Sequence, residues 1–311
     1  MKLSMYTGTL NDHAYLGLTQ TERLKLIRGC GFTCVDYSCD PYMVGDGWKV
    51  HAETAKTAMA EAGVVAMQGH APCVNPLLPG NIDLLHWADN ILSFCRAAGI
   101  PQVVIHPGAV DGNTREQFFD ANVAFYKSLI PAAERSGVGV LIENIGNYAD
   151  PYYLWNGADL REMIDRVDHP LFTACWDVGH ANHFFPEHCN QYDSIMALGD
   201  KLTALHVHDN AGDISDTREH YRIDMHTMPF ASFPTSVNYD AVLQGLKDAG
   251  YAGTFNFEVA VAGRTNRKPF IYKGEEVKKL ALPSIEYWKQ LHTANYIIGK
   301  YMLETYGMFE E

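Results

Sequence analysis

Side chains that bind metal ions stand at the ends of several short apolar segments of this sequence. Six segments end in such a residue, namely His70, His106, Glu143, Asp177, His206 and Glu258. Carboxylate oxygens combined with imidazole nitrogens suit a divalent ion such as Mn, Co, Mg or Zn, and a ligand set without thiolates is not that of a typical structural zinc site. The ends of parallel strands meet on one rim of a closed barrel, so residues far apart in sequence become neighbours there. The pattern predicts a metal-dependent enzyme.

Four of these residues are the strongest candidates for a shared metal site. They are Glu143 in LIEN, Asp177 in WDVGH, His206 in HVHDN and Glu258 in FNFEV. Any one of them alone is more typical of a polar residue that is hydrogen-bonded at a strand end. Four of them at corresponding positions of four strands favour a common ligand set.

Five further residues are candidates for binding additional metal ions or substrate: His70, His106, His180, Asp224 and His226. His180 follows Asp177 by three positions, and Asp224 and His226 form the motif DMH. Both spacings also occur by chance, and a solvated loop pair is the alternative interpretation of DMH. His70 and His106 stand just before prolines, where they could bind metal or donate hydrogen bonds to substrate.

The elements that must position these residues follow a regular rhythm of helix end, glycine and short apolar run. Glycine relieves the left-handed backbone at a helix C-cap, and the apolar run after it suits a strand that is buried on both faces. The runs predict strands at residues 2–6, 33–37, 64–69, 102–106, 138–143, 173–177, 202–207 and 254–258. Helical patterns lie between them at residues 22–28, 52–62, 83–98, 116–136, 160–167 and 239–249. This alternation favours an α/β fold of the (β/α)8 TIM barrel type over a doubly wound sheet.

No linker divides the sequence, so we expect one domain over residues 1–311, with the barrel at about 1–262 and a C-terminal helical extension at about 270–311. Two long connections, residues 144–157 and 209–236, are expected to form rim loop insertions close to the chemistry. Residues 282–306 carry apolar side chains at helical spacing. They could extend the outer ring of helices or contact a second copy in a homo-oligomer.

Composition restricts the partners and the compartment. The formal net charge of -13, from 24 basic and 37 acidic residues, disfavours an extended nucleic-acid surface and fits a small-molecule substrate better. The seven cysteines are an odd number without a CxxC pair, which indicates reduced thiols and a cytoplasmic protein. The first ten residues lack a hydrophobic signal core, and no apolar run approaches the ~18 residues that cross a membrane.

These residues, in this order, resemble the xylose isomerase-like TIM barrel superfamily, which contains sugar isomerases, sugar phosphate isomerase/epimerase proteins and the endonuclease IV-like family. The likeness covers roughly residues 1–262. In the epimerase-like branch it implies one divalent metal, such as manganese or zinc, on Glu143, Asp177, His206 and Glu258, a substrate contact from His180, and no organic cofactor.

The endonuclease branch implies three zinc ions, and this chain fills all nine of the corresponding positions. The resemblance pairs His70 and His106 with Glu143, and His180 with Asp224 and His226, beside the set of four. Charge favours the sugar branch, because the expected rim loops, such as NYADPYYLWN and DNAGDISD, are aromatic and acidic rather than basic. One departure from the sugar-handling relatives is that DMH is followed by TMPFASFP instead of a glycine-rich turn.

The resemblance thus implies carbohydrate metabolism, and nucleic acid is a disfavoured partner. Trp155 could stack on a sugar, although such aromatic residues more often pack their own loop, and Arg264 could hold a phosphate or carboxylate, although solvated surface charge is the alternative. We expect an isomerase or epimerase that acts on a ketose, keto-polyol or sugar phosphate by proton transfer through a metal-bound enediolate, with Glu143 and Glu258 as catalytic residues. The alternatives are a lyase or dehydratase acting on a keto-inositol or glycoside, a trinuclear zinc phosphodiesterase, and a barrel without catalytic function.

Overall fold

Eight parallel strands form the centre of the molecule. The computed structural model describes residues 1–10, 17–145, 153–183, 190–212, 226–231, 236–260, 270–277 and 284–311. The strands are β1 (Leu3–Tyr6), β2 (Cys34–Ser38), β3 (Val65–His70), β4 (Gln102–Val104), β5 (Gly139–Glu143), β6 (Phe172–Asp177), β7 (Leu202–His206) and β8 (Phe255–Phe257). Each of them lies within two residues of a predicted strand at both ends, and their order in the sheet is β7-β6-β5-β4-β3-β2-β1-β8.

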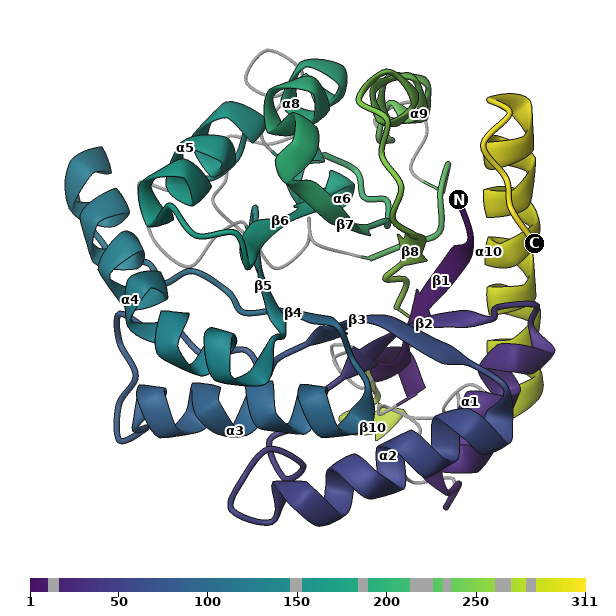
Figure 1. The fold of residues 1–311 in the computed structure, drawn as a ribbon. Coiled ribbons are helices and arrows are strands. Elements are labelled where there is room, and N and C mark those ends of the chain that lie inside the picture. Colours follow the sequence, from purple (N-terminus) through teal and green to yellow (C-terminus); the bar gives the residue numbers. More distant parts are fainter. Residues whose placement is uncertain are drawn as a thin grey trace.

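The two outermost strands of this sheet meet and close the barrel (Figure 1). Just past β7, Val207 forms a parallel bridge with Phe257 of β8. The backbone N–H of Val207 donates to the Asn256 carbonyl at 2.8 Å, and the N–H of Glu258 donates to the Val207 carbonyl at 3.0 Å. The predicted (β/α)8 TIM barrel is confirmed.

Helices surround the barrel, and most of them lie at the predicted positions. They are α1 (Gln20–Gly29), α2 (Trp48–Ala62), α3 (Leu84–Ala98), α4 (Arg115–Ser136), α5 (Gly157–Val167), α8 (Gln191–Leu198) and α9 (Tyr239–Asp248). Their ends follow from local chemistry: Thr19 and Thr114 form capping boxes with Glu22 and Gln117, and Gly99 ends α3 in the left-handed conformation. The long helix α10 (Ile285–Thr305) packs against α1 and β1 and completes the ring between α9 and α1 (Figure 1).

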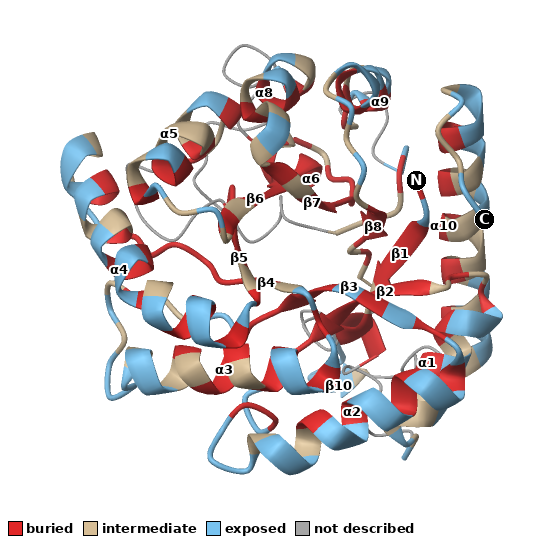
Figure 2. Cartoon of the chain, in the orientation of Figure 1, coloured by how far each residue is buried: buried red, intermediate tan, exposed pale blue. Residues whose placement is uncertain are grey.

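Buried residues, coloured red in Figure 2, make up most of the strands. The alternation of side chains along each strand divides them between two clusters. In β5, Val140 and Ile142 belong to the large apolar core that includes the helices, whereas Leu141 belongs to a small cluster with Val104, Cys175 and Ala204. Residues two apart in a strand share a face. The next positions on the face of that small cluster are the side chains at the end of each strand, and these therefore point into the mouth of the barrel.

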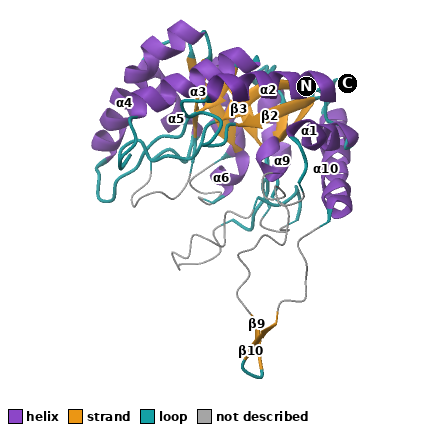
Figure 3. Cartoon of the chain, turned by 90° about the horizontal axis from the view of Figure 1, so that it is seen from below, coloured by secondary structure: helices purple, strands orange, loops and turns teal. Residues whose placement is uncertain are grey.

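The sequence patterns missed several elements. The short helix α6 (Val178–Asn182), helix α8 and the 3-10 turn at Gly199–Lys201 all lie between β6 and β7. The predicted C-terminal helical extension is wrong at its start, because residues 270–277 form an antiparallel hairpin of β9 (Phe270–Tyr272) and β10 (Glu275–Val277), apart from the barrel in Figure 3. The hairpin turns at Lys273 and Gly274, which both have positive φ, so no helix runs through these residues.

Among the described residues, no helix is both long and apolar enough to span a membrane.

Candidate metal centre

Four of the predicted ligands converge at the C-terminal mouth of the barrel. Glu143, Asp177, His206 and Glu258 each offer one donor atom, and these atoms all lie within 4.8 Å of one another. The centre of the group is His206 Nδ1, which lies 2.9 Å from Glu258 Oε2, 3.2 Å from Glu143 Oε1 and 3.8 Å from Asp177 Oδ2. The structure therefore brings these four side chains together, as expected from their positions at strand ends.

Strand alternation and one asparagine place the two ligands from β5 and β6. Glu143 follows Leu141 on the inward face of β5, and Asp177 follows Cys175 in the same way on β6. Asn144 joins the two strand ends: its side-chain amide donates to the Asp177 carbonyl at 2.8 Å and accepts from the Asp177 N–H at 2.7 Å. Asp177 also caps α6 by accepting from the His180 N–H at 2.7 Å.

A buried aspartate of β2 orients the imidazole ligand. His206 Nε2 donates to Asp36 Oδ2 at 2.9 Å, and both side chains are inaccessible to solvent. A nitrogen that donates to a carboxylate carries the proton, so in a neutral ring the lone pair of Nδ1 faces the three carboxylates. A carboxylate behind a ligating histidine is the usual arrangement in metal sites.

The charges of this group fit a bound cation. Three carboxylates around an imidazole lone pair repel one another in a dry environment, and a divalent ion between them would remove that repulsion. Burial by itself raises the pKa of Glu143, but the charge of His206 and hydrogen bonds from His106, His180 and His206 hold that pKa well below its usual value. The pKa of Glu258 is lowered in the same way against its burial, chiefly by His206. Glu143 and Glu258 are thus ionised, as carboxylate ligands must be, whereas the same carboxylates raise the pKa of His206, which would release its Nδ1 proton when an ion binds.

His70 and His106 lie beside Glu143. His106 Nε2 is 3.0 Å from Glu143 Oε2 and 3.1 Å from His70 Nε2, while His70 Nδ1 donates to the Ala71 carbonyl at 2.8 Å. His70 also belongs with Glu143 and His206 to a second group that could hold a metal ion. These two histidines extend the candidate site toward β3 and β4.

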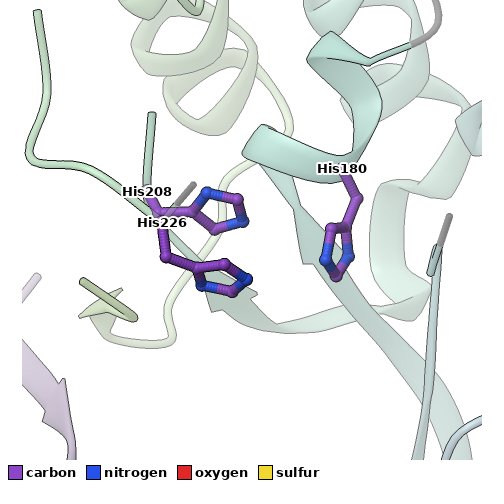
Figure 4. A group of neighbouring side chains, drawn as sticks. All are labelled: His180, His208 and His226. Carbon is purple, nitrogen blue, oxygen red and sulfur yellow. The ribbon is translucent and has the colours of Figure 1, made fainter. Parts of the chain in front are cut away.

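Of the remaining predicted residues, His180 and His226 lie at the barrel mouth (Figure 4), and Trp155 lies against the core. His180 Nδ1 lies 3.2 Å from Glu143 Oε1, and His226 lines a cavity of about 190 Å³ together with Glu258. Trp155 is half-buried and packs against the apolar core, so its contact with substrate stays a prediction. Asp224 and Arg264 lie outside the described residues.

Four residues that the sequence patterns did not single out belong to the site: Asp36, Asn144, His208 and Tyr6. Tyr6 ends β1, lies in the wall of the cavity beside Glu258, and has its hydroxyl 3.3 Å from Ser38 Oγ. Burial, followed by the charge of Glu258, raises the pKa of Tyr6 well above its usual value, so its hydroxyl keeps its proton. Tyr6 ends a strand, as the predicted ligands do, and this position in the sequence could have identified it as a site residue.

The family described as xylose isomerase-like TIM barrel matches residues 24–290, and the chain belongs to this family. Among curated relatives, it is 26% identical over 159 residues to protein MJ1311 of Methanocaldococcus jannaschii, covering 50% of each chain. It is 24% identical over 270 residues to protein y4fM of Sinorhizobium fredii, covering 76% of this chain and 79% of the relative. The match thus spans only half the length of MJ1311.

Solved structures support the same fold. A D-tagatose 3-epimerase-like protein superposes with a TM-score of 0.70 at 17% identity, covering 99% of this chain and 98% of the other. A D-psicose 3-epimerase has a TM-score of 0.69 at 13% identity, with 97% and 99% covered. The IOLI protein with a bound zinc atom has a TM-score of 0.66 at 15% identity, with all of both chains covered.

Proposed function

We propose that this chain is a divalent-metal-dependent isomerase or epimerase of a small sugar or keto-polyol. The observation that carries the proposal is the convergence of two glutamates from different strands, Glu143 and Glu258, with Asp177 and His206 on one point of the barrel mouth. The epimerase names of the similar structures support this reaction class.

Glu143, Asp177, His206 and Glu258 would hold the ion, which when bound supplies Lewis-acid stabilisation to the oxygen of a carbonyl substrate. The chain itself must then move a proton at the neighbouring carbon. Glu258 is the better placed of the two glutamates for this step, because its side chain is 13% exposed and faces the cavity, whereas that of Glu143 is 1% exposed.

Other side chains of the cavity suit the positioning of substrate. The protonated hydroxyl of Tyr6 can donate a hydrogen bond to a sugar oxygen in the cavity that it shares with Glu258. Glu143 accepts from His106 and is in contact with His180 and His206, which restricts its movement. We therefore assign removal of the carbon-bound proton to Glu258. Glu143 would deliver a proton to the opposite face of the carbon, after receiving that proton from His106, its hydrogen-bond partner.

Solvent exchange tests the proposal. The protein loaded in turn with Mn, Co, Mg and Zn is incubated with a panel of ketoses and keto-inositols in D2O, and deuterium at carbon is followed by NMR. We expect exchange next to a carbonyl in the wild type and at least a hundredfold slower exchange in Glu258→Gln at unchanged fold. Full exchange by Glu258→Gln would reject its role, and the absence of exchange with every ion and substrate would reject the reaction class.

The same preparations separate the alternatives. A dehydratase would release water and give an unsaturated product after exchange, which NMR also detects. A zinc phosphodiesterase would instead cleave duplex DNA that contains an abasic site, and would give no carbon-bound deuterium in any sugar.

A further inference from the structure

Thr9 connects the wall of the candidate substrate cavity to the C-terminal helix. It lies in the turn that follows β1, and its side chain lines the same cavity as Tyr6 and Glu258. Its hydroxyl oxygen lies 3.3 Å from Trp288 Nε1 and 3.2 Å from His292 Nε2, both of which belong to α10. We propose that Thr9 is a substrate-binding residue, whose hydroxyl donates a hydrogen bond to an acceptor oxygen of the sugar. This inference rests on the proposed sugar reaction and adds a specificity contact to its site.

One face of α10 brings these groups to the barrel. Trp288, His292 and Asn295 follow one another at spacings of four and three residues, which places them on the same side of a helix, and all three are buried. Gly299 continues this face, and a Cβ atom there would lie 2.6 Å from the ring of Phe257 in β8. The helix therefore packs closely enough on the barrel for its polar side chains to reach Thr9.

The first hydrogen bond to Thr9 has a fixed direction. The indole nitrogen of Trp288 can only donate, so Thr9 Oγ1 accepts from it. The ring of His292 lies directly beside the indole, with ring centroids 4.3 Å apart. Two ring nitrogens of α10 thus approach the same hydroxyl oxygen.

Asn295 sets the direction of the second hydrogen bond. Its side-chain nitrogen Nδ2 lies 3.2 Å from His292 Nδ1. An amide nitrogen only donates, so Nδ1 accepts, and in the neutral ring the proton is then on Nε2. His292 Nε2 consequently donates to Thr9 Oγ1, which accepts two hydrogen bonds in all.

The other end of the Asn295 amide supports this assignment. Asn295 Oδ1 is buried and has no hydrogen-bond partner in the described part of the chain. A buried oxygen without a partner is unfavourable, so an apolar side chain would be the more stable choice if packing alone mattered. Donation from Nδ2 to His292 gives the amide a function that an apolar side chain cannot supply.

The two accepted hydrogen bonds determine what Thr9 can do. A hydroxyl has two acceptor lone pairs and one hydrogen, so Thr9 keeps that hydrogen for a partner of its own. Among the described residues, no side chain or carbonyl accepts it. Thr9 and Tyr6 therefore both present hydroxyl donors to the cavity that Glu258 faces. We expect the cavity to favour substrates with an acceptor oxygen at this point, such as a sugar hydroxyl or ring oxygen.

The protonation of His292 tests the first step without any sugar. Protein labelled with 15N at histidine is studied by long-range proton–nitrogen correlation NMR, and the His292 ring is assigned by its loss in His292→Gln. We expect a neutral ring with the proton on Nε2. A neutral ring with the proton on Nδ1 would overturn the proposal, because Thr9 would then donate to His292 and have no hydrogen left for substrate.

Affinities test the contact itself. Calorimetry gives the affinity of the metal-loaded chain for each ketose of the panel and for the monodeoxy derivatives of the tightest binder. In the wild type we expect one monodeoxy derivative to bind about 3- to 10-fold more weakly than its parent, as for the loss of one hydrogen bond. Thr9→Val should bind the parent and that derivative equally, and Thr9→Ser should restore the difference. If every deoxygenation weakened binding to Thr9→Val as much as to the wild type, Thr9 would not contact the sugar.

A matched control and the choice of readouts separate this contact from folding and from the reaction. Thr305→Val, at an exposed threonine near the end of α10, should change neither the His292 protonation nor any affinity. Circular dichroism reports whether each variant is folded, and Thr9→Ser keeps the hydroxyl that α10 requires. Calorimetry and NMR need no turnover. Failure of the proposed reaction would appear as a lack of deuterium exchange, whereas failure of the Thr9 contact would appear in these two measurements.

Discussion

Asp36 accepts the Nε2 hydrogen of His206 at 2.9 Å in the fully buried interior of the barrel. The same oxygen of Asp36 accepts from the side-chain amides of Gln68 at 2.8 Å and Asn256 at 3.2 Å. The Asp36 carboxylate of β2 therefore accepts hydrogen bonds from side chains of β3, β7 and β8. Its effect is to hold His206 so that Nδ1 faces Glu143, Asp177 and Glu258.

Asp36→Asn should weaken metal binding without loss of the fold. The amide matches the carboxylate in size and its oxygen can still accept, but the charge that makes His206 a better ligand is lost. We expect metal affinity to fall about 10- to 100-fold, as is typical when such outer partners are changed. Competition with a chromogenic chelator measures this affinity. Asp46→Asn is the matched control, because Asp46 also faces a histidine but is exposed. Unchanged affinity in Asp36→Asn would contradict the orienting role.

Asn144→Ala should both lower stability and displace Asp177 from the group that it forms with Glu143, His206 and Glu258. The side chain of Asn144 makes two hydrogen bonds to the backbone of Asp177, and its loss leaves a buried N–H and a buried carbonyl unsatisfied. We expect the free energy of unfolding to fall by about 1–3 kcal/mol for each group that remains unsatisfied. Urea denaturation measures the change. The control Gln290→Ala, on the exposed face of α10, should stay within about 0.5 kcal/mol of the wild type.

The strands and most outer helices could be predicted because the buried strands read as apolar runs, five of which follow a turn glycine. The position of Glu143 or Asp177 in the site follows from the same pattern, since a polar residue at the end of such a run must face the mouth of a barrel. The short helices between β6 and β7 could not be predicted in this way. Helix α8 has only eight residues, and α6 begins directly at the strand end with Asp177 as both site residue and cap.

Asp36 and His208 show what strand ends alone do not reveal. Asp36 lies in the middle of β2, where an isolated aspartate gives no sign of which face it occupies. His208 stands two residues after His206 in HVHDN, and in a continuing strand both side chains would lie on the same face. However, β7 ends at His206, so this alternation does not place His208. The contact of His208 with Asp177 depends on the space left by Gly179 of another segment, which only the folded structure shows.

Gly157→Ala should destabilise the outer ring of helices. A Cβ at Gly157, the first residue of α5, would lie 2.0 Å from the backbone carbonyl oxygen of Ser194 in α8. Neither helix backbone can yield locally, so we expect the free energy of unfolding to fall by about 1–3 kcal/mol. Gly29→Ala is the matched control, because Gly29 is helical and has open space around it. That control should gain up to about 1 kcal/mol, and equal effects of the two substitutions would refute the packing argument.

Cys73 should react as a thiolate near neutral pH in the metal-free protein. Among the described cysteines it is the exposed one, whereas Cys30, Cys34, Cys39, Cys95 and Cys175 are buried. Its crowded surroundings would raise the pKa of the thiol, but the charge and hydrogen bond of His106 outweigh this and lower that pKa to about 7 from 9.0.

A lowered thiol pKa means that the reactive thiolate forms at a lower pH. The rate of alkylation of Cys73 by iodoacetamide, followed by mass spectrometry of its peptide, should therefore rise with a midpoint near pH 7. His106→Gln removes the cation, so its midpoint should shift upward toward the ordinary thiol value. His86→Gln, at an exposed histidine outside the barrel mouth, should leave the midpoint unchanged. A midpoint near 9 in the wild type would show that His106 does not carry the charge that this prediction requires.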